Sequence, residues 1–213
     1  MRIFLSLVFL SVSFGCALTL EEVRTDLRKS VLASDSVELG IRTTVSSPSI
    51  SAPQVIGVHL VRKGSGKVFA EIKMPMSRQR MIVNGNRMKT IDLDTRKSRV
   101  VPYDGKSLGA SAFADFNPLD SGEWAEPEYV SENLYSIRGT AGTLYYNPRK
   151  KRIERMETFD AEKSVVTEFA YGAANNPQKM TVRVSVQGVE TTMVTEILKL
   201  GHSKDFPDKL FEF

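Results

Sequence analysis

Residues 54–94 constrain the fold more than any other part of this chain, because they contain four strand-like segments joined by very short links. The segments are VIGVHLVRK, KVFAEIKM, RQRMIV and RMKTIDLD, and the links are Gly64-Ser65-Gly66, Pro75-Met76-Ser77 and Asn84-Gly85-Asn86. Parallel neighbours need a crossover of a dozen or more residues, so links this short predict an antiparallel meander. The Asn84-Gly85 pair further predicts a type I′ hairpin turn, in which both central residues have positive φ.

Alternation along these segments separates an apolar face from a charged one. The charged face carries Lys67, Glu71 and Lys73, and the opposite positions are apolar: Ile56, Val58, Leu60, Val68, Ala70, Ile72 and Met74. A strand with one apolar and one charged face is half-buried in its sheet. Sheets built this way can form curved surfaces and cups, and a cup with an apolar face can hold an apolar ligand.

The second half of the chain repeats the same pattern. Segments such as SENLYSIRG, KRIERMETF, SVVTEFAYG and KMTVRVSVQ alternate and are joined by short turns. Further strands are expected at residues 36–47 and 98–102. We therefore predict a mainly β fold, a strongly curved antiparallel sheet or open half-barrel of ten or eleven strands.

Two helical regions are predicted to cover this sheet. Residues 18–33 have apolar side chains at three- and four-residue steps and acidic residues in the first turn, which is typical of an amphipathic helix. Residues 103–129 form an insertion too long for a turn and too apolar for a free linker, with a short helix expected at 107–116. The insertion is either a moving lid or a plug that closes one end of the sheet, and its apolar residues include Phe113, Phe116 and Leu119.

The first residues predict an exported protein. A basic start is followed by IFLSLVFLSVSF, without charge, and then by the small residues Gly15, Cys16 and Ala17. This is the layout of a secretory signal peptide. We expect residues 1–17 to be removed by cleavage near Ala17, which leaves a soluble exported protein with one domain over residues 18–213. The alternative is a membrane-anchored lipoprotein in which Cys16 becomes the lipid-bearing first residue.

Composition adds two constraints. Cys16 is the one cysteine, so no intramolecular disulfide can form and packing alone must hold the chain together. The net charge is +4, with one dense basic run at residues 149–152. We interpret this run as a solvated hairpin turn, with contact to anionic headgroups or a partner as the alternative. Nothing else in the chain suggests nucleic-acid binding.

Catalytic patterns are weak. Neither His59 nor His202 has a cysteine or carboxylate at metal-ligand spacing, and the chain contains no HExxH and no GxSxG motif. Alternation places His59 on the charged face, where exposure is the default. Asp92 and Asp94 are more typical of a turn than of an acid–base pair. We therefore expect no enzyme, no metal and no cofactor.

The order of these parts resembles the bacterial lipoprotein carrier superfamily of the periplasm, which includes the soluble carrier LolA and the anchored receptor LolB. The resembling motifs follow the signal and the first helix, in this order: Gly57-x-x-Leu60-x-Arg62, Lys67-Val68-Phe69-Ala70-Glu71, Pro75, Met81-Ile82-Val83-Asn84-Gly85, Arg152-Ile153-Glu154-Arg155-Met156-Glu157 with Asp160, and Leu210-Phe211-Glu212-Phe213. Together they cover most of residues 18–213. The resemblance implies a half-barrel with a helical lid over a hydrophobic cavity, and Arg42 is the candidate for the strand arginine that bonds to the lid.

With the alternation, the resemblance implies a set of site residues. The ligand-binding cavity would be formed by Val58, Leu60, Val68, Ala70, Ile72, Met81, Val83, Met180, Val182 and Val184, and the lid by Phe113, Phe116 and Leu119. Replacing Leu60 with glutamate should then weaken ligand binding while the fold survives.

Three functions are open. The first is a periplasmic carrier that shields the acyl chains of lipoproteins or other lipids and helps sort lipoproteins to the outer membrane. The second is a non-transport envelope module of the same fold, such as a lipoprotein sensor, and the third is a structural protein with a packed cup. A carrier would be a monomer, and its partners would be an inner-membrane releasing complex and an outer-membrane acceptor.

Overall fold

The computed structural model describes residues 18–28, 36–64, 66–103, 118–120, 122–140, 142–160, 162–172, 175–201 and 206–213. These residues form the helix α1 (Leu20–Arg28), the short 3-10 helices η2 (Pro118–Asp120) and η3 (Asp208–Phe211), and thirteen strands. The strands are β1 (Ser36–Ser46), β2 (Gln54–Lys63), β3 (Lys67–Met74), β4 (Ser77–Asn84), β5 (Arg87–Asp92), β6 (Ser98–Pro102), β7 (Glu128–Ser131), β8 (Leu134–Gly139), β9 (Gly142–Asn147), β10 (Arg152–Phe159), β11 (Lys163–Tyr171), β12 (Pro177–Val186) and β13 (Val189–Gly201).

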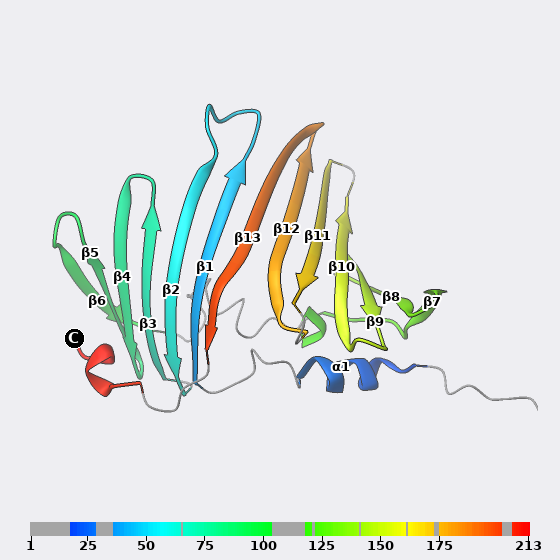
Figure 1. Ribbon diagram of the computed structural model, residues 1–213, viewed down its shortest axis with the longest axis horizontal. Coiled ribbons are helices and arrows are strands. Elements are labelled where there is room, and N and C mark those ends of the chain that lie inside the picture. The colour runs from blue at the N-terminus through cyan, green and yellow to red at the C-terminus, as the bar shows by residue number, and fades with distance from the viewer. Residues whose placement is uncertain are drawn as a thin grey trace, which may run out of the picture.

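All thirteen strands belong to one antiparallel sheet, in the order β6-β5-β4-β3-β2-β1-β13-β12-β11-β10-β9-β8-β7. Every neighbour in this order is also a neighbour in sequence except at the centre, where β1 pairs with β13. Figure 1 shows the strands side by side as one curved sheet, with β6 and β7 as its two edges. The predicted mainly β, open half-barrel architecture is confirmed, with thirteen strands where ten or eleven were expected.

Strand β7 was not predicted from the sequence. It begins at Glu128, within the last two residues of the predicted insertion at 103–129. It pairs with β8 across a tight turn in which Asn133 has a φ of 59°. All four residues of β7 are exposed. An exposed edge strand needs no alternation of apolar and polar side chains, so the pattern that identifies the other strands is absent here.

The predicted four-strand meander is confirmed, because β2, β3, β4 and β5 pair in sequence order. The turn type expected at Asn84-Gly85 is wrong. The central turn residues are Gly85 and Asn86, and of these Gly85 alone has positive φ, 61°. Glycine with positive φ at the first central position is the type II′ pattern. A turn with two positive φ values occurs instead between β12 and β13, at Gln187 (50°) and Gly188 (82°).

Register keeps apolar side chains in phase across the sheet. Leu39 pairs with Leu60, Leu60 with Ala70, and Ala70 with Met81, so one apolar row crosses β1–β4 on a single face. On the other side of β1, a different row on the same face runs from Thr43 through Thr195 and Met180 to Phe169 on β11. Phe169 packs against the cluster beneath α1. We call the face that carries α1 the inner face and the opposite one the outer face.

Three apolar clusters stabilise the described part of the chain. The first joins α1 and η2 to the inner face of β8–β10: Leu20, Val23, Leu119, Ile137, Leu144, Tyr146 and Ile153. The second lies on the inner face of β1–β4: Val37, Leu39, Ile41, Leu60, Val68 and Val83. The third lies on the outer face: Val61, Phe69, Ile82 and Phe211.

The C-terminal segment 206–213 covers an apolar patch on the outer face, beside the lower ends of β3 and β4 in Figure 1. Phe211 is fully buried there against Val61, Phe69 and Ile82. The Nδ2 of Asn84 donates to the carbonyl oxygen of Phe211 at 3.2 Å. Without this segment three neighbouring apolar side chains of the sheet would face water, which costs about 25 cal/mol per Å² of exposed apolar area.

The helix predicted at residues 18–33 is confirmed over the nine residues of α1. Residues 29–33 lie outside the described residues. The expected signal sequence with Cys16, the expected helix at 107–116 and His202 also lie outside them. Among the described helices, none is long and apolar enough to span a bilayer.

Candidate functional site

The inner face brings together all ten residues predicted to bind an apolar ligand. On the first half of the sheet, the cross-strand pairs Val58–Ile72, Leu60–Ala70 and Val68–Val83 place them in register, and Ala70 pairs with Met81. On the second half, Met180, Val182 and Val184 pair with Thr195, Met193 and Thr191 of β13. Since side chains alternate with a period of two, one in-phase register is enough to collect these residues from four strands, β2, β3, β4 and β12, on one surface.

Burial divides these ten residues into two groups. Leu60, Val68, Ala70 and Val83 are buried, and Val58 and Met81 pack against the cluster that contains most of them. The remaining four, Ile72, Met180, Val182 and Val184, are half-buried and lie outside the three clusters that the described residues form.

The second group belongs to a larger surface, which we call the apolar belt. It consists of half-buried inner-face residues of β1, β2, β3, β12 and β13: Val45, Ile56, Ile72, Met74, Met180, Val182, Val184 and Met193. The belt is continuous across the centre of the sheet, because Val45 pairs with Met193 and Met193 pairs with Val182. Its side chains keep contact with solvent and belong to none of the three clusters.

Leu60 is therefore a poor position for testing ligand binding. Its side chain is 2% exposed and packs with Leu39, Val68 and Val83. A glutamate there would be buried without a partner, which costs several kcal/mol. The prediction that the fold survives Leu60→Glu is not supported by this burial, and a belt residue such as Val182 is the better choice.

Helix α1 closes the other end of the inner face. Val23 and Leu20 are buried against β8–β10, and the backbone N–H of Leu20 donates to Glu126 at 2.8 Å. The phenol of Tyr146 donates to Asp26 Oδ2 at 2.8 Å, and Lys151 Nζ donates to Asp26 Oδ1 at 3.0 Å. Burial and the bond to Asp26 raise the pKa of Tyr146, so the phenol stays a donor at alkaline pH as well. The helix is thus attached by both apolar and charge-assisted contacts.

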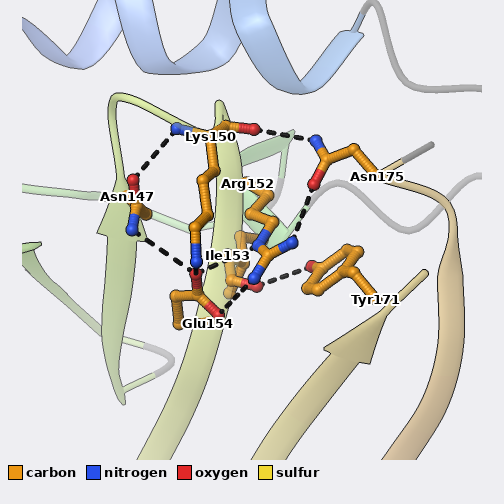
Figure 2. Close-up of polar contacts among 7 residues, drawn as sticks. All are labelled: Asn147, Lys150, Arg152, Ile153, Glu154, Tyr171 and Asn175. Carbon is orange, nitrogen blue, oxygen red and sulfur yellow. Dashed lines mark hydrogen bonds and ion pairs between the residues drawn. The ribbon is translucent and has the colours of Figure 1, made fainter. Parts of the chain in front are cut away.

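The basic run 149–152 forms the β9–β10 turn, as predicted, and Arg149 and Lys150 are exposed there. Its last residue is not a solvated cation. Figure 2 shows Arg152 between Glu154 (Nε to Oε1, 3.0 Å) and Asn175 (Nη1 to Oδ1, 2.9 Å). The guanidinium also lies 4.2 Å from the ring centre of Tyr171, whose hydroxyl donates to the carbonyl of Ile153 at 2.6 Å.

These contacts give the basic run a structural role. Arg152 joins the β9–β10 turn to the β11–β12 connection, and Lys151 joins the same turn to α1. Lys150 adds its backbone carbonyl, which accepts from Asn175 Nδ2 at 2.8 Å (Figure 2). Sequence reasoning missed these links, because their partners lie far away in the chain.

Of the three predicted lid residues, the structure places one. Leu119 of η2 is buried in the cluster that α1 forms with β8–β10. This position on the inner face agrees with a covering segment. Phe113 and Phe116 lie outside the described residues.

The chain matches no family model and no curated protein. Among solved structures, a LolA superfamily protein from Nitrosomonas europaea matches with a TM-score of 0.62 at 14% identity, over 92% of this chain and 99% of that one. The chain has the LolA fold. A DUF1329 family protein from Desulfovibrio piger matches with a TM-score of 0.54 at 12% identity, over 89% and 93% of the two chains. A domain assigned to the outer membrane lipoprotein-sorting proteins, from Vibrio parahaemolyticus, has a TM-score of 0.54 at 7% identity, over 89% and 94%.

The strand register shows that one predicted residue, Arg42, was assigned to the wrong face. Arg42, the candidate for an arginine directed at a lid, is exposed and pairs with Gly57 and Glu196 on the outer face. Arg62 does lie on the inner face, where it pairs with Val37 and Val68 and is half-buried. Alternation could have placed Arg62 on the inner face, because it lies two positions after Leu60 in the same strand.

The residues considered for catalysis, His59 and Asp92, make hydrogen bonds that stabilise the fold. His59 lies on the outer face, as predicted, and shares Glu38 with Lys199 at 2.9 and 2.7 Å. Asp92 Oδ1 accepts from the backbone N–H groups of Asp94 and Thr95, which confirms its role in a turn. Within the described ranges, no three His, Cys, Asp or Glu side chains are arranged to hold a metal ion.

A hollow with a volume of about 350 Å³ occurs at the strand ends. It lies between the β10–β11 and β12–β13 turns and is lined by Asp160, Glu162, Lys163, Ser164, Ser185, Gln187 and Gly188. These side chains are polar or charged, so this hollow does not suit an apolar chain. The apolar belt is the better candidate site.

Proposed function

We propose that the protein is a binding protein, not an enzyme, that shields acyl chains of lipoproteins or other lipids against the apolar belt. The observation that supports this most directly is the division of the inner face. The parts of the inner face next to the belt are packed into clusters. The belt side chains, among them Val45 and Met193, are only half-buried. A soluble domain rarely leaves a continuous apolar surface in contact with water unless that surface has a partner.

The chemistry of the belt suits acyl chains. Its residues are valine, isoleucine and methionine, which offer dispersion and the exclusion of water but no directional recognition. Burial of one methylene contributes about 0.8 kcal/mol. A chain that buries ten of them would therefore gain about 8 kcal/mol before the cost of ordering it.

The proposed setting is the periplasm, where the protein would carry a lipid or lipoprotein and help sort lipoproteins to the outer membrane. This extends to the chain what the names of its structural neighbours say of them. The proposed partners are an inner-membrane releasing complex and an outer-membrane acceptor, with the protein acting as a monomer without a cofactor. Anchoring through Cys16 would instead make it a receptor on the membrane.

A structural envelope module with the same fold and a packed cup is the second candidate. The observation in its favour is the tight packing of β1–β4, where four of the ten predicted cavity residues are fully part of the core. In that case the belt would be only the small part of the inner face that stays unpacked, and it would bind no acyl chain with measurable affinity.

A displacement assay with a fluorescent fatty acid separates the two candidates. The purified protein should bind the probe saturably, and Val182→Glu should weaken binding at least about tenfold, since a charge would enter an apolar site. The matched control is Val166→Glu on the adjacent strand. Val166 lies on the outer face opposite Arg183 and Glu157, so the same substitution there should leave affinity unchanged. Unfolding curves of both variants report whether the fold is intact.

Absence of saturable binding by the wild-type protein would exclude the carrier and favour the structural module. Equal loss of affinity in Val182→Glu and Val166→Glu would show that the belt is not the site. Transport is tested separately, by measuring whether the protein captures labelled lipoprotein released from inner-membrane vesicles and delivers it to outer-membrane vesicles.

A further inference from the structure

The methionines of the chain gather on the inner face. Seven methionines follow Met1 in the sequence, and all seven are described. Six of them face inward, each from a different strand: Met74, Met81, Met88, Met156, Met180 and Met193. The seventh, Met76, is in the β3–β4 turn and is 96% exposed.

The inward direction follows from strand pairing. Met81 pairs with Ala70, and Met88 pairs with Val83, both within the inner-face rows of β1–β4. Across the centre, Met193 pairs with Val45 and Met180 with Thr195. Met156 pairs with Thr167, which in turn pairs with Val182. Met74 follows Ile72 by two positions on β3 and so shares its face.

All six inward methionines are half-buried, and two pairs of them are close enough to move together. Met180 and Met193 are diagonal neighbours on β12 and β13, and Met81 and Met88 are diagonal neighbours on β4 and β5. Diagonal positions are about 7–8 Å apart, within reach of long side chains. Met74, Met180 and Met193 lie outside the three clusters, so their thioethers can change rotamer without first displacing a cluster residue.

This choice of residue is unusual for half-buried strand positions, which favour valine, isoleucine and aromatic side chains. Methionine is unbranched, with three rotatable bonds and a polarizable sulfur, and it fills irregular gaps. Branched side chains have few rotamers and hold one surface shape. Methionine on six strands makes the surface deformable across nearly the whole width of the sheet.

We infer that the inward methionines make the site conformable, so that it accepts apolar chains of different shape with similar affinity. The ligand class is then acyl chains in general, including kinked cis-unsaturated and methyl-branched chains, rather than one straight chain. This inference rests on the proposed function, because it assumes that the inner face binds apolar chains. It adds which residues set the breadth of ligand choice.

The test compares three fatty acids of equal length, one straight and saturated, one cis-unsaturated and one methyl-branched. The wild-type protein should bind all three within about threefold. The double variant Met180→Leu/Met193→Leu keeps the volume and the apolar character of the belt but replaces flexible side chains by branched ones. It should retain the straight chain and bind the other two about tenfold more weakly, since hydrophobic pockets of fixed shape discriminate by at least that factor. Met76→Leu is the matched control and should behave as wild type.

The outcomes separate this inference from the proposed function. Wild-type binding of all three chains with an unchanged spread in the double variant overturns the inference and leaves the proposed function standing. A wild-type protein that already binds one shape at least tenfold better also overturns it. A wild-type protein that binds none of the three overturns both.

A second measurement uses the unmodified protein, in case the double variant folds poorly. Methionine methyl groups labelled with carbon-13 give separate NMR signals. Addition of the straight or the kinked chain should shift the signals of Met180 and Met193 differently for the two ligands, while the signal of Met76 stays in place. Identical shifts with both ligands, or shifts at Met76 alone, would contradict a conformable inner surface.

Discussion

The phenol of Tyr146 and the carboxylate of Asp26 are 120 residues apart in the chain and 2.8 Å apart in space. Tyr146 is completely buried in β9, and Asp26 lies on the one described α-helix, with 16% of its side chain exposed. The bond fixes α1 against the end of the sheet opposite the third cluster. It therefore adds to the apolar contacts that hold α1 over β8–β10.

Tyr146→Phe should destabilise the protein by about 1–2 kcal/mol, the usual worth of a hydrogen bond to a charged group in a partly buried place. Urea unfolding measures this loss. Amide hydrogen exchange should show faster exchange in α1 than in β1 and β13. The matched control is Tyr145→Phe, whose hydroxyl bonds to Glu157 at 3.0 Å and not to α1, so hydrogen exchange in α1 should stay as in the wild type. Equally faster exchange of α1 in both variants would show that the Asp26 bond does not hold the helix.

Alkaline pH should weaken the fold through its buried tyrosines. Burial raises the pKa of Tyr146 and of Tyr171 in the folded state. An unfolded tyrosine loses its proton near pH 10, so above that pH the unfolded state binds fewer protons than the folded one and stability falls. Urea midpoints measured from pH 8 to pH 11 should decline above about pH 10. The decline should be shallower in the double variant Tyr146→Phe/Tyr171→Phe, and an equally steep decline would exclude these two residues as its cause.

Acid should weaken the attachment of the C-terminal segment. Hydrogen bonds from Lys63 and Lys67, both at 2.9 Å, lower the pKa of Asp208 to about 2. A depressed pKa contributes stability above the unfolded value near 4, and this contribution is lost as pH falls through about 2. Between about pH 5 and pH 2, the wild type should lose more stability than Asp208→Asn. Glu212→Gln, in the same segment, is the control and should follow the wild type. Parallel curves for all three proteins would refute the role of Asp208.

Phe211→Ala should cost about 3–5 kcal/mol, because a fully buried aromatic side chain is removed from the outer-face cluster. Phe213→Ala is the control two residues away. Phe213 is 43% exposed, with the Arg87 guanidinium 5.3 Å from its ring centre, and its loss should cost below about 1 kcal/mol. Thermal or urea unfolding compares the two variants. Similar losses would mean that the segment does not pack as described.

Gly142→Ala should destabilise the start of β9. Gly142 has a φ of 128°, and a Cβ there would overlap the carbonyl oxygen of Glu157 on β10. Strained backbone of this kind costs about 1–3 kcal/mol, and the overlap adds to it. Gly201→Ala is the control, because no atom lies within 4 Å of its added Cβ, and it should be neutral or slightly stabilising. A neutral Gly142→Ala would show that the backbone relaxes more easily than the register suggests.

Several features of this protein were accessible from the sequence because they depend on neighbouring residues. Alternation with a period of two assigned Val58, Leu60 and Ile72 to one face, and short turns left little choice of pairing partner. The same logic gave the antiparallel meander and the outward position of His59. It failed at β7, whose exposed residues carry no alternation, and at Gly85, where strand pairing shifted the turn by one residue.

The sequence by itself determined which side chains share the inner face, because register is local once turns are short. Only the tertiary structure decided which of them are packed and which stay open. Leu60 is part of the core and Val182 is part of the belt because different side chains pack against each of them. Asp26 meets Tyr146 through contacts between segments that are 120 residues apart. Such contacts form by burial of apolar area, which is not directional, so no local pattern in the chain records them.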